Sequence, residues 1–135
     1  MISAKDVMSP DVMTIREDTK MKDIIRLLVQ HRITGLPVVS EDDRLLGMVT
    51  EKDILKILYE RKPNVKSARD LMTTNIASFD ENANLMEVFK ALVENNYRRV
   101  PILSEGKLAG IISRADIIRF ISRQTGKKEQ EQSEQ

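Results

Sequence analysis

The chain contains no cysteine and no tryptophan. Without cysteine it can form neither a disulfide nor a thiolate metal site, which fits a reducing compartment. Aromatic residues make up only 4% of the 135 residues, so few side chains are available for nucleic-acid bases to stack on. The formal net charge is +1, and an extended basic surface for nucleic acid is therefore not expected.

Long apolar runs and glycine-rich loops are also missing. No apolar run approaches the length of a membrane span, and residues 1–6 do not resemble a signal peptide, so we expect a cytoplasmic protein that does not enter a membrane. The five glycines are spread singly, which excludes a P-loop, and there is no Gly-x-Ser-x-Gly elbow. The single histidine, His31, cannot build a multi-histidine metal site. We therefore expect no enzyme, no catalytic cofactor and no metal centre.

What the sequence does contain is a duplication. Residues 7–15 resemble residues 71–79, so residue 7 returns as residue 71, 64 positions later. At the same offset residues 35–39 (GLPVV) meet residues 99–103 (RVPIL), and residues 46–55 meet residues 109–118 one position closer. The second repeat is one residue shorter in a polar turn, where residues 104–107 correspond to residues 40–44 and a deletion is tolerated. Any ligand cleft made by one half should therefore have a counterpart in the other.

Each repeat has the pattern of a short strand, a helix, a strand, a turn, a strand and a helix. In the first repeat we expect strands at 12–15, 36–39 and 45–49, with Pro37 near a strand start or on an edge, a helix capped by Asp18-Thr19, and a helix beginning at Thr50. In the second we expect strands at 76–79, 100–103 and 108–112, a helical stripe over 85–92, and a helix from Ser113 to about Ser122.

These elements predict an α/β (α+β) fold of two β-α-β-β-α repeats. Neither repeat is large enough to be stable alone, so we expect the two to pack sheet to sheet about a pseudo-twofold axis. The expected boundaries are 1–62 for the first repeat, 63–70 for a linker and 71–123 for the second repeat. Residues 124–135 have no apolar anchor and are expected to form a disordered polar tail.

One duplicated element, Gly47–Asp53 and Gly110–Asp116, carries the most specific chemistry. A strand ends and a helix begins there, so backbone N–H groups and the positive end of the helix dipole point to one spot. The Asp of each copy could accept hydrogen bonds from the two vicinal hydroxyls of a ribose, with the hydroxyl of Thr50 or Ser113 beside it. Plain helix capping is the alternative, but two copies in matched context favour a ligand.

Two further features lie at or within the expected strands. Arg98 and Arg99 stand at a loop-to-strand junction, where paired guanidinium groups suit a phosphate, although they could equally be solvated surface charges. The first repeat has Thr34-Gly35 at the corresponding positions. The matched hydroxyls of Thr14 and Ser78 could bond the edge of a flat base, or simply be partly exposed strand residues.

In the order and duplication of these motifs, with Met8-Ser9-Pro10 returning as Met72-Thr73-Thr74, the chain resembles a tandem pair of CBS domains, often called a Bateman module. The resemblance runs from about Ser3 to Ser122. It implies a non-enzymatic regulatory module that binds AMP, ADP, ATP or S-adenosylmethionine in clefts between the repeats and signals to a separate effector protein. It also implies a homodimer that pairs through its helices. Thr34-Gly35 lacks the basic pair, so the two clefts could differ in ligand or occupancy.

The resemblance also assigns the adenosine-ligand site to matched positions of both repeats. These are Thr14, Ile15, Gly35, Leu36, Pro37, Thr50 and Asp53 in the first, and Ser78, Phe79, Arg98, Arg99, Val100, Pro101, Ser113, Arg114 and Asp116 in the second. A second hypothesis is a ligand-free dimerising scaffold with vestigial clefts, which would show no thermal shift with any adenosine compound. A hydrolase or a nucleic-acid binder is disfavoured by the missing catalytic groups and the small net charge.

Overall fold

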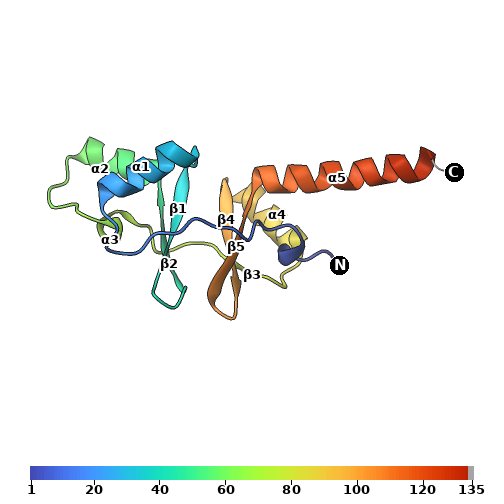
Figure 1. Ribbon diagram of the computed structural model, residues 1–135, viewed down its shortest axis with the longest axis horizontal. Helices are drawn as coiled ribbons and strands as arrows, with labels where there is room; N and C mark the ends of the chain where they lie inside the picture. The colour runs from blue at the N-terminus through green and yellow to red at the C-terminus, as the bar shows by residue number, and fades with distance from the viewer. Residues whose placement is uncertain (134–135) are drawn as a thin grey trace. The chain divides into compact units, whose positions relative to one another are not determined.

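The computed structural model describes residues 1–133 and has a mixed α/β fold, as expected (Figure 1). Within these residues there are five α-helices, one short 3-10 helix and two sheets. In chain order the elements are η1 (Ala4–Asp6), α1 (Met21–His31), β1 (Gly35–Val39), β2 (Leu45–Thr50), α2 (Glu51–Glu60), α3 (Ala68–Leu71), β3 (Phe79–Asp80), α4 (Leu85–Glu94), β4 (Arg99–Ser104), β5 (Lys107–Ser113) and α5 (Arg114–Ser133).

The chain forms two compact units, and these are not the two sequence repeats. Among the described residues, unit 1 contains Met1–Val12, Ser78–Glu105 and residues 109–133, whereas unit 2 contains Met13–Ala77 and Gly106–Leu108. The first dozen residues of the first repeat thus belong with the elements of the second repeat. Residues 63–77 in turn belong with the first. Unit 1 takes residues 1–12 from the first repeat, and unit 2 takes residues 71–77 and 106–108 from the second, which the boundaries expected at 1–62 and 71–123 did not include.

Unit 2 is built on the antiparallel pair β1–β2, with an irregularity between Val38 and Val39. Ile15 adds one parallel bridge to Val38 on the other side of β1, so the strand expected at 12–15 is reduced to a single residue. It ends there because the next residues turn: the Arg16 N–H donates to the Thr19 hydroxyl, and the Thr19 N–H donates to the Arg16 carbonyl. That hydroxyl does not cap α1, whose N-cap is Lys20 rather than the expected Asp18-Thr19.

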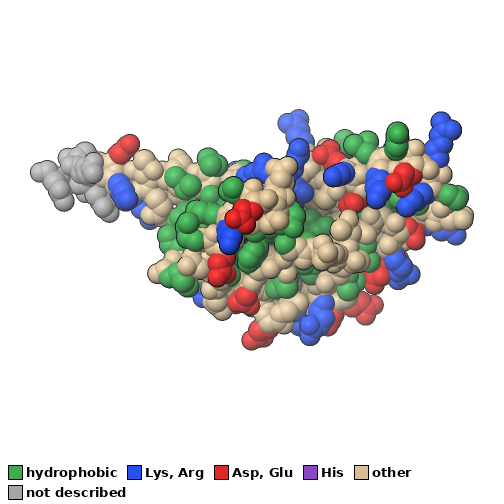
Figure 2. All heavy atoms as spheres, turned by 180° about the vertical axis from the view of Figure 1, so that it is seen from behind, with side chains coloured by type: hydrophobic (Ala, Val, Ile, Leu, Met, Phe, Trp, Pro, Cys, Tyr) green, Lys and Arg blue, Asp and Glu red, His purple; other side chains and the backbone are tan. Residues whose placement is uncertain are grey.

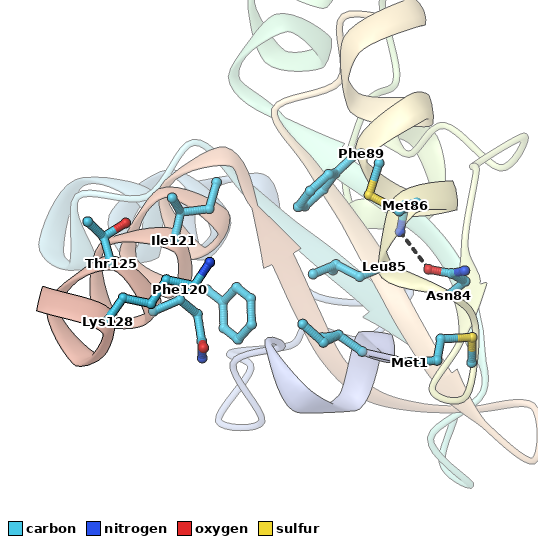
Figure 3. A pocket seen from close by; sticks show the side chains of 11 residues that line it. Met1, Asn84, Leu85, Met86, Phe89, Phe120, Ile121, Thr125 and Lys128 are labelled. Carbon is cyan, nitrogen blue, oxygen red and sulfur yellow. Dashed lines mark hydrogen bonds between the residues drawn. The ribbon is translucent and has the colours of Figure 1, made fainter. Parts of the chain in front are cut away.

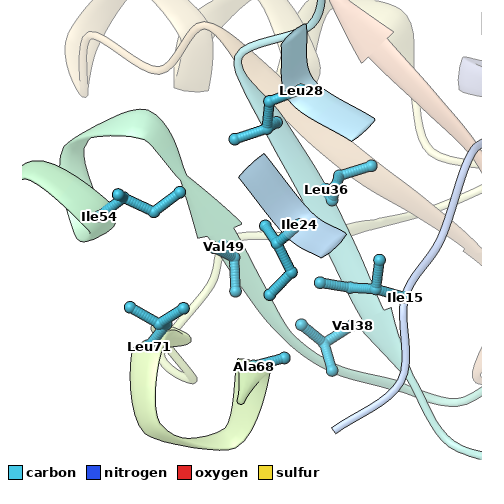
Figure 4. Packing of buried hydrophobic residues seen from close by; sticks show 9 residues of the cluster. All are labelled: Ile15, Ile24, Leu28, Leu36, Val38, Val49, Ile54, Ala68 and Leu71. Atoms are coloured by element: carbon cyan, nitrogen blue, oxygen red, sulfur yellow. The ribbon is translucent and has the colours of Figure 1, made fainter. Parts of the chain in front are cut away.

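The core of unit 2 is aliphatic, as the scarcity of aromatic residues requires. Figure 4 shows side chains from the sheet and all three helices converging on it. Its buried members are Ile15, Ile24, Leu28, Leu36, Val38, Val49, Ile54, Ala68 and Leu71. Two of these, Ala68 and Leu71, come from α3, which falls at the end of the segment expected to be a linker. The N–H of Ala68 donates to the Thr19 carbonyl at 2.9 Å, which ties that segment to the unit.

Unit 1 repeats this plan with the three-stranded sheet β3-β4-β5, the helices α4 and α5, and η1. The strand expected at 76–79 is again short, because only Phe79 and Asp80 pair with β4, in parallel. The N–H of Ala4 donates to the Ala83 carbonyl, as that of Ala68 does to Thr19. Its buried core is formed by Ala4, Leu85, Val88, Leu92, Val100, Ile102, Ile112 and Ile117.

The end of the chain differs from the expectation. Helix α5 continues to Ser133, so residues 124–133 are helical rather than a disordered tail; residues 134–135 lie outside the described part. Seven of these ten residues are Lys, Glu or Gln, which are good helix formers; the others are Thr125, Gly126 and Ser133. Helix α2 ends sooner, because Arg61 adopts a left-handed conformation (φ 50°) and Pro63 follows.

The surface carries both signs of charge. On the face shown in Figure 2, Lys and Arg side chains are interspersed with Asp and Glu side chains. This distribution agrees with the net charge of +1 and gives no continuous basic surface on that face. Over residues 1–133, every helix is too short or too polar to cross a membrane.

Candidate functional site

In unit 2 the candidate site is the junction at which β2 ends and α2 begins. Thr50 is the N-cap of α2, and its backbone N–H and hydroxyl both donate to Asp53 Oδ2, at 2.8 and 2.9 Å. The Asp53 N–H donates back to the Thr50 hydroxyl at 3.3 Å. This is the capping box that the sequence predicted. The other carboxylate oxygen, Oδ1, accepts from the hydroxyl of Thr73 at 3.0 Å.

Unit 1 contains the same junction between β5 and α5. The Ser113 N–H and hydroxyl donate to Asp116 Oδ2 at 2.8 and 2.9 Å, and the Asp116 N–H donates to the Ser113 hydroxyl at 3.1 Å. Asp116 Oδ1 accepts from the hydroxyl of Ser9 at 3.1 Å. It also accepts from the guanidinium of Arg119 at 2.7 Å. The predicted Ser113 cap is thus present, and the Asp116 carboxylate accepts from two donors outside the cap, Ser9 and Arg119.

Each copy of the duplicated element requires its glycine, because another segment of the chain passes close to that residue. In unit 2, Met48 and Thr73 exchange two backbone hydrogen bonds of 2.9 and 3.0 Å, so residues 72–73 cross β2 beside Gly47. A Cβ at Gly47 would lie 2.8 Å from the Thr73 carbonyl oxygen. Any larger residue would push this segment away, and with it the hydroxyl that bonds Asp53.

The same approach occurs in unit 1. Ser9 and Ile111 exchange backbone hydrogen bonds of 2.9 and 3.0 Å. A Cβ at Gly110 would lie 2.6 Å from the sulfur of Met8 and 2.9 Å from the carbonyl oxygen of Ser9. The duplicated Met8-Ser9 and Met72-Thr73 motifs are therefore the segments exchanged between repeats, and each supplies a hydroxyl to the Asp of the unit that receives it.

Asp116 is a buried carboxylate, with 7% of its surface exposed. Burial raises its pKa, but hydrogen bonds from Ser113, Arg119 and Ser9 favour the ionised form and hold the pKa below its ordinary value. All four of its acceptor positions are used: two donors reach Oδ2 and two reach Oδ1. A ribose hydroxyl bonding to this carboxylate would replace one of these donors.

A backbone hydrogen bond fixes each helix start to the loop before the proline strand. In unit 2 the N–H of Glu51 donates to the Thr34 carbonyl at 3.0 Å. In unit 1 the N–H of Arg114 donates to the Arg98 carbonyl at 3.2 Å. The Arg114 side chain also bonds the loop, through the Tyr97 carbonyl at 3.0 Å and Asn96 Oδ1 at 2.7 Å. The structure thus brings Arg98 and Arg114 to the start of α5.

The remaining predicted residues of unit 2 divide into two groups. Ile15 and Leu36 point into the core cluster (Figure 4), so only their backbone atoms are left for a ligand. Thr14, by contrast, is exposed. Gly35 pairs with Thr50 across β1–β2, and the Pro37 carbonyl accepts from the Ile15 N–H at 3.0 Å. The segment around Ile15, the start of β1 and the start of α2 are therefore neighbours.

The corresponding residues of unit 1 divide in the same way. Val100 belongs to the core and Phe79 packs against it, whereas Ser78 is half-buried. Pro101 is fully buried like Pro37, one position from a core residue and so on the opposite face of its strand. Arg99 is half-buried and interacts with its surroundings.

Three residues that contact the carboxylates were not predicted from the sequence. Ser9 and Thr73 lie far from their partners in the chain, 107 and 20 positions away. Their signal was the repeated Met-Ser/Thr motif, which marked a duplication without showing what it touched. The third, Arg119, follows Asp116 by one helical turn, and that spacing favours an ion pair.

Unit 1 also has a hollow that none of the predicted site residues lines. Its volume is about 510 Å³, and it lies among the N-terminal residues, α4 and α5. Figure 3 shows Leu85, Phe89 and Phe120 forming an apolar wall, with Thr125 and Lys128 toward one end.

Both units thus place an acidic side chain at a helix start within the same duplicated fold, and the family model of the CBS domain matches residues 4–60 and again residues 68–123. The chain belongs to the CBS-domain family. Each match spans one sequence repeat, so the tandem CBS pair expected from the motifs is confirmed.

Several proteins are similar over nearly the whole chain. Hypoxic response protein 1 of Mycobacterium tuberculosis is 34% identical over 123 residues, which cover 90% of this chain and 86% of that protein. A crystal structure of CBSX2, a CBS-pair protein from Arabidopsis thaliana, in complex with AMP matches with a TM-score of 0.86 and 29% identity, over 93% of this chain and 99% of that one. The CBS pair of MJ0100, in complex with 5′-methylthioadenosine and S-adenosyl-L-methionine, matches with a TM-score of 0.78 and 26% identity, over 92% and 98%.

One similar structure contains a metal. A crystal structure of Hypoxic Response Protein I contains two coordinated zinc ions; it matches with a TM-score of 0.77 and 35% identity, over 87% of this chain and 98% of that one. In the part of our chain that the structure describes, no three His, Cys, Asp or Glu side chains are grouped so that they could hold a metal ion.

Proposed function

We propose that this CBS pair is a non-enzymatic regulatory module that binds adenosine-containing ligands, with AMP, ADP, ATP and S-adenosylmethionine as the candidates. The observation that carries the proposal is the duplicated helix start, where a carboxylate is held by the same capping geometry in both units. The AMP complex of CBSX2 and the methylthioadenosine and S-adenosylmethionine complex of MJ0100 support it.

In this proposal, Asp53 and Asp116 accept the ribose hydroxyls, and Thr50 and Ser113 hold each carboxylate in place. Thr14 and Ser78, with the proline strands beside them, bond the adenine edge. Ligand binding would bias the conformation of the pair, and a separate effector protein would respond to that bias. We place the protein in the cytoplasm.

Titration calorimetry tests the ligand. AMP, ADP, ATP and S-adenosylmethionine are titrated into the wild-type protein, with GMP as the base control. We expect Asp53→Asn or Asp116→Asn to weaken binding of the ligand at its own unit by tenfold or more, about 1.4 kcal/mol. Asp70→Asn is the matched control, because Asp70 makes the same capping box with Ser67 at the start of α3, outside the proposed site. Unchanged affinity in both Asp53→Asn and Asp116→Asn would refute the assigned roles.

One observation favours the second hypothesis, a scaffold that binds no ligand. All acceptor positions of Asp116 are already occupied by protein donors, so helix capping accounts for this residue without a ligand. A thermal-shift series separates the two hypotheses, because a true ligand must raise the unfolding midpoint by mass action. No shift with any adenosine compound at millimolar concentration would favour the scaffold.

We also propose that the protein is a homodimer. Both units expose apolar side chains at matched positions, on α1 and α2 in unit 2 and on α4 and α5 in unit 1. These are Val29, Leu55 and Leu58 in unit 2, and Val93, Ile118 and Ile121 in unit 1. Exposed apolar surface repeated in both copies is typical of an interaction face. Light scattering should show a dimer that Leu55→Glu with Ile118→Glu converts to a monomer. Lys56→Glu, which changes charge on α2 without removing an apolar group, should leave it intact.

A further inference from the structure

The two units differ in charge at one matched position of the proposed site. The pairs Thr34 with Glu51 and Arg98 with Arg114 are equivalent, because in each the helix's first N–H donates to the carbonyl of the loop residue. Unit 2 therefore has one hydroxyl and one carboxylate at this junction, where unit 1 has two guanidinium groups. With the next helix residue included, Lys52 in unit 2 against Ala115 in unit 1, the formal charges sum to 0 and +2.

The guanidinium of Arg114 is held in place. Its bonds to the Tyr97 carbonyl and to Asn96 Oδ1 keep it over the loop that leads into β4. Arg98, one residue after Tyr97, is exposed on the same loop. Both residues lie at the start of α5, and guanidinium groups bind phosphate through paired, charge-assisted hydrogen bonds.

The junction of unit 2 offers the opposite environment. The Glu51 carboxylate stands at the first position of α2, where it would repel a phosphate dianion. The hydroxyl of Thr34 is buried and has no hydrogen-bond partner among the residues that the structure describes. A buried hydroxyl without a partner suits a neutral polar group, because each then satisfies the other.

We infer that the two units bind different classes of adenosine ligand: a phosphorylated nucleotide in unit 1, and an adenosine compound without phosphate in unit 2. This inference rests on the proposed function. The pairs Arg98–Arg114 and Thr34–Glu51 decide whether a unit binds a phosphorylated or a phosphate-free ligand. The ribose-binding carboxylates are common to both units and do not distinguish the two ligand classes.

Exchanging the two pairs tests the inference. AMP and 5′-methylthioadenosine are titrated by calorimetry into the wild type, Arg98→Thr/Arg114→Glu and Thr34→Arg/Glu51→Arg. The wild type should bind one equivalent of each compound without competition. The first double variant should weaken AMP binding by tenfold or more and change methylthioadenosine binding by less than threefold. The second should bind AMP at two sites.

Controls separate charge from folding. Arg26→Thr/Arg123→Glu removes the same total charge at exposed positions away from both junctions and should leave AMP binding unchanged. If Arg114→Glu lowers the unfolding midpoint, Arg98→Thr alone keeps the Arg114 contacts and should still weaken AMP binding. Binding of both compounds to one shared site, or AMP affinity unmoved by the Arg98 variants, would overturn the inference. A wild type that binds neither of these compounds, nor ADP, ATP or S-adenosylmethionine, would instead refute the proposed function.

Discussion

Asp53 and Asp116 occupy the same place in two copies of one element, yet their surroundings differ. Both accept a backbone N–H and a hydroxyl from the residue that caps their helix. Asp116 is also paired with Arg119, whereas the corresponding residue of unit 2, Lys56, makes no ion pair with Asp53 within residues 1–133. Asp116 is buried and Asp53 is half-buried.

This difference shows what the duplication has kept and what has changed. The backbone pattern is the same in both units: the capping box, the segment that crosses beside the glycine, and the bond from the helix start to the preceding loop. The side chains around it have diverged in charge and burial. The shared backbone fixes where a ligand could bind, and the divergent side chains decide how strongly each carboxylate is already bonded within the protein.

The largest expected effect is on stability when the carboxylates are removed. Asp116→Ala should lower the free energy of unfolding by about 3 kcal/mol, because it removes a cap and leaves Arg119 and the partly buried Ser9 hydroxyl without their acceptor. Asp53→Ala should cost only about 1 kcal/mol, mainly for the cap. Urea unfolding at pH 7 measures both. Equal losses would mean that the extra donors of Asp116 add nothing.

The next effect tests the close approach beside each glycine. Gly47→Ala and Gly110→Ala should each cost about 1–3 kcal/mol, because the new Cβ would press on a backbone carbonyl less than 3 Å away. Gly126→Ala is the control: nothing lies within 4 Å of its Cβ position, and alanine should stabilise α5 by up to about 1 kcal/mol. Thermal unfolding of the three variants gives the comparison, and a neutral Gly110→Ala would show that residues 8–9 do not pack as closely as described.

The local part of this site could be read from the sequence. A capping box joins residues three positions apart, so Thr50 with Asp53 and Ser113 with Asp116 were predictable, and both are present. The order of helices and strands followed from apolar spacing for the same reason. The lengths of the strands expected at 12–15 and 76–79 were overestimated, because a parallel bridge such as Ile15 to Val38 depends on a partner distant in the chain.

The exchange of segments could not be read from the sequence. The Ser9 hydroxyl reaches Asp116 across 107 positions, and nothing in the nearby residues distinguishes this partner from one in its own repeat. The tail was mispredicted for a different reason. Its residues lack an apolar face, but strong helix formers after the expected helix end at Ser122 extend α5 by its own backbone hydrogen bonds.

A smaller effect should distinguish the two hydroxyls supplied by the exchanged segments. Ser9→Ala should cost about 1 kcal/mol, because its bond to Asp116 is partly buried and its acceptor is charged. Thr73→Ala should cost about half of that, because its bond to Asp53 is exposed to water. Chemical denaturation of both variants alongside the wild type measures the difference. A larger loss for Thr73→Ala would reverse the order proposed for the two units.

The smallest effect is a dependence on pH that belongs to Asp116. Its pKa is lowered in the folded protein, so its ionised form contributes stability that is fully present above the ordinary value of 3.8 and is lost as the pH falls through the lowered value. Hydrogen bonds from Ser3 also lower the pKa of Asp6, and hydrogen bonds from the N–H groups of Lys66 and Ser67 lower that of Asp70, so the wild type and Asp116→Asn should both weaken in acid. Only the difference in unfolding free energy between the two proteins measures the contribution of Asp116. That difference should be constant from pH 7 to about pH 5 and shrink below 3.8; if it stayed constant in acid, the pKa of Asp116 would not differ between the folded and unfolded states.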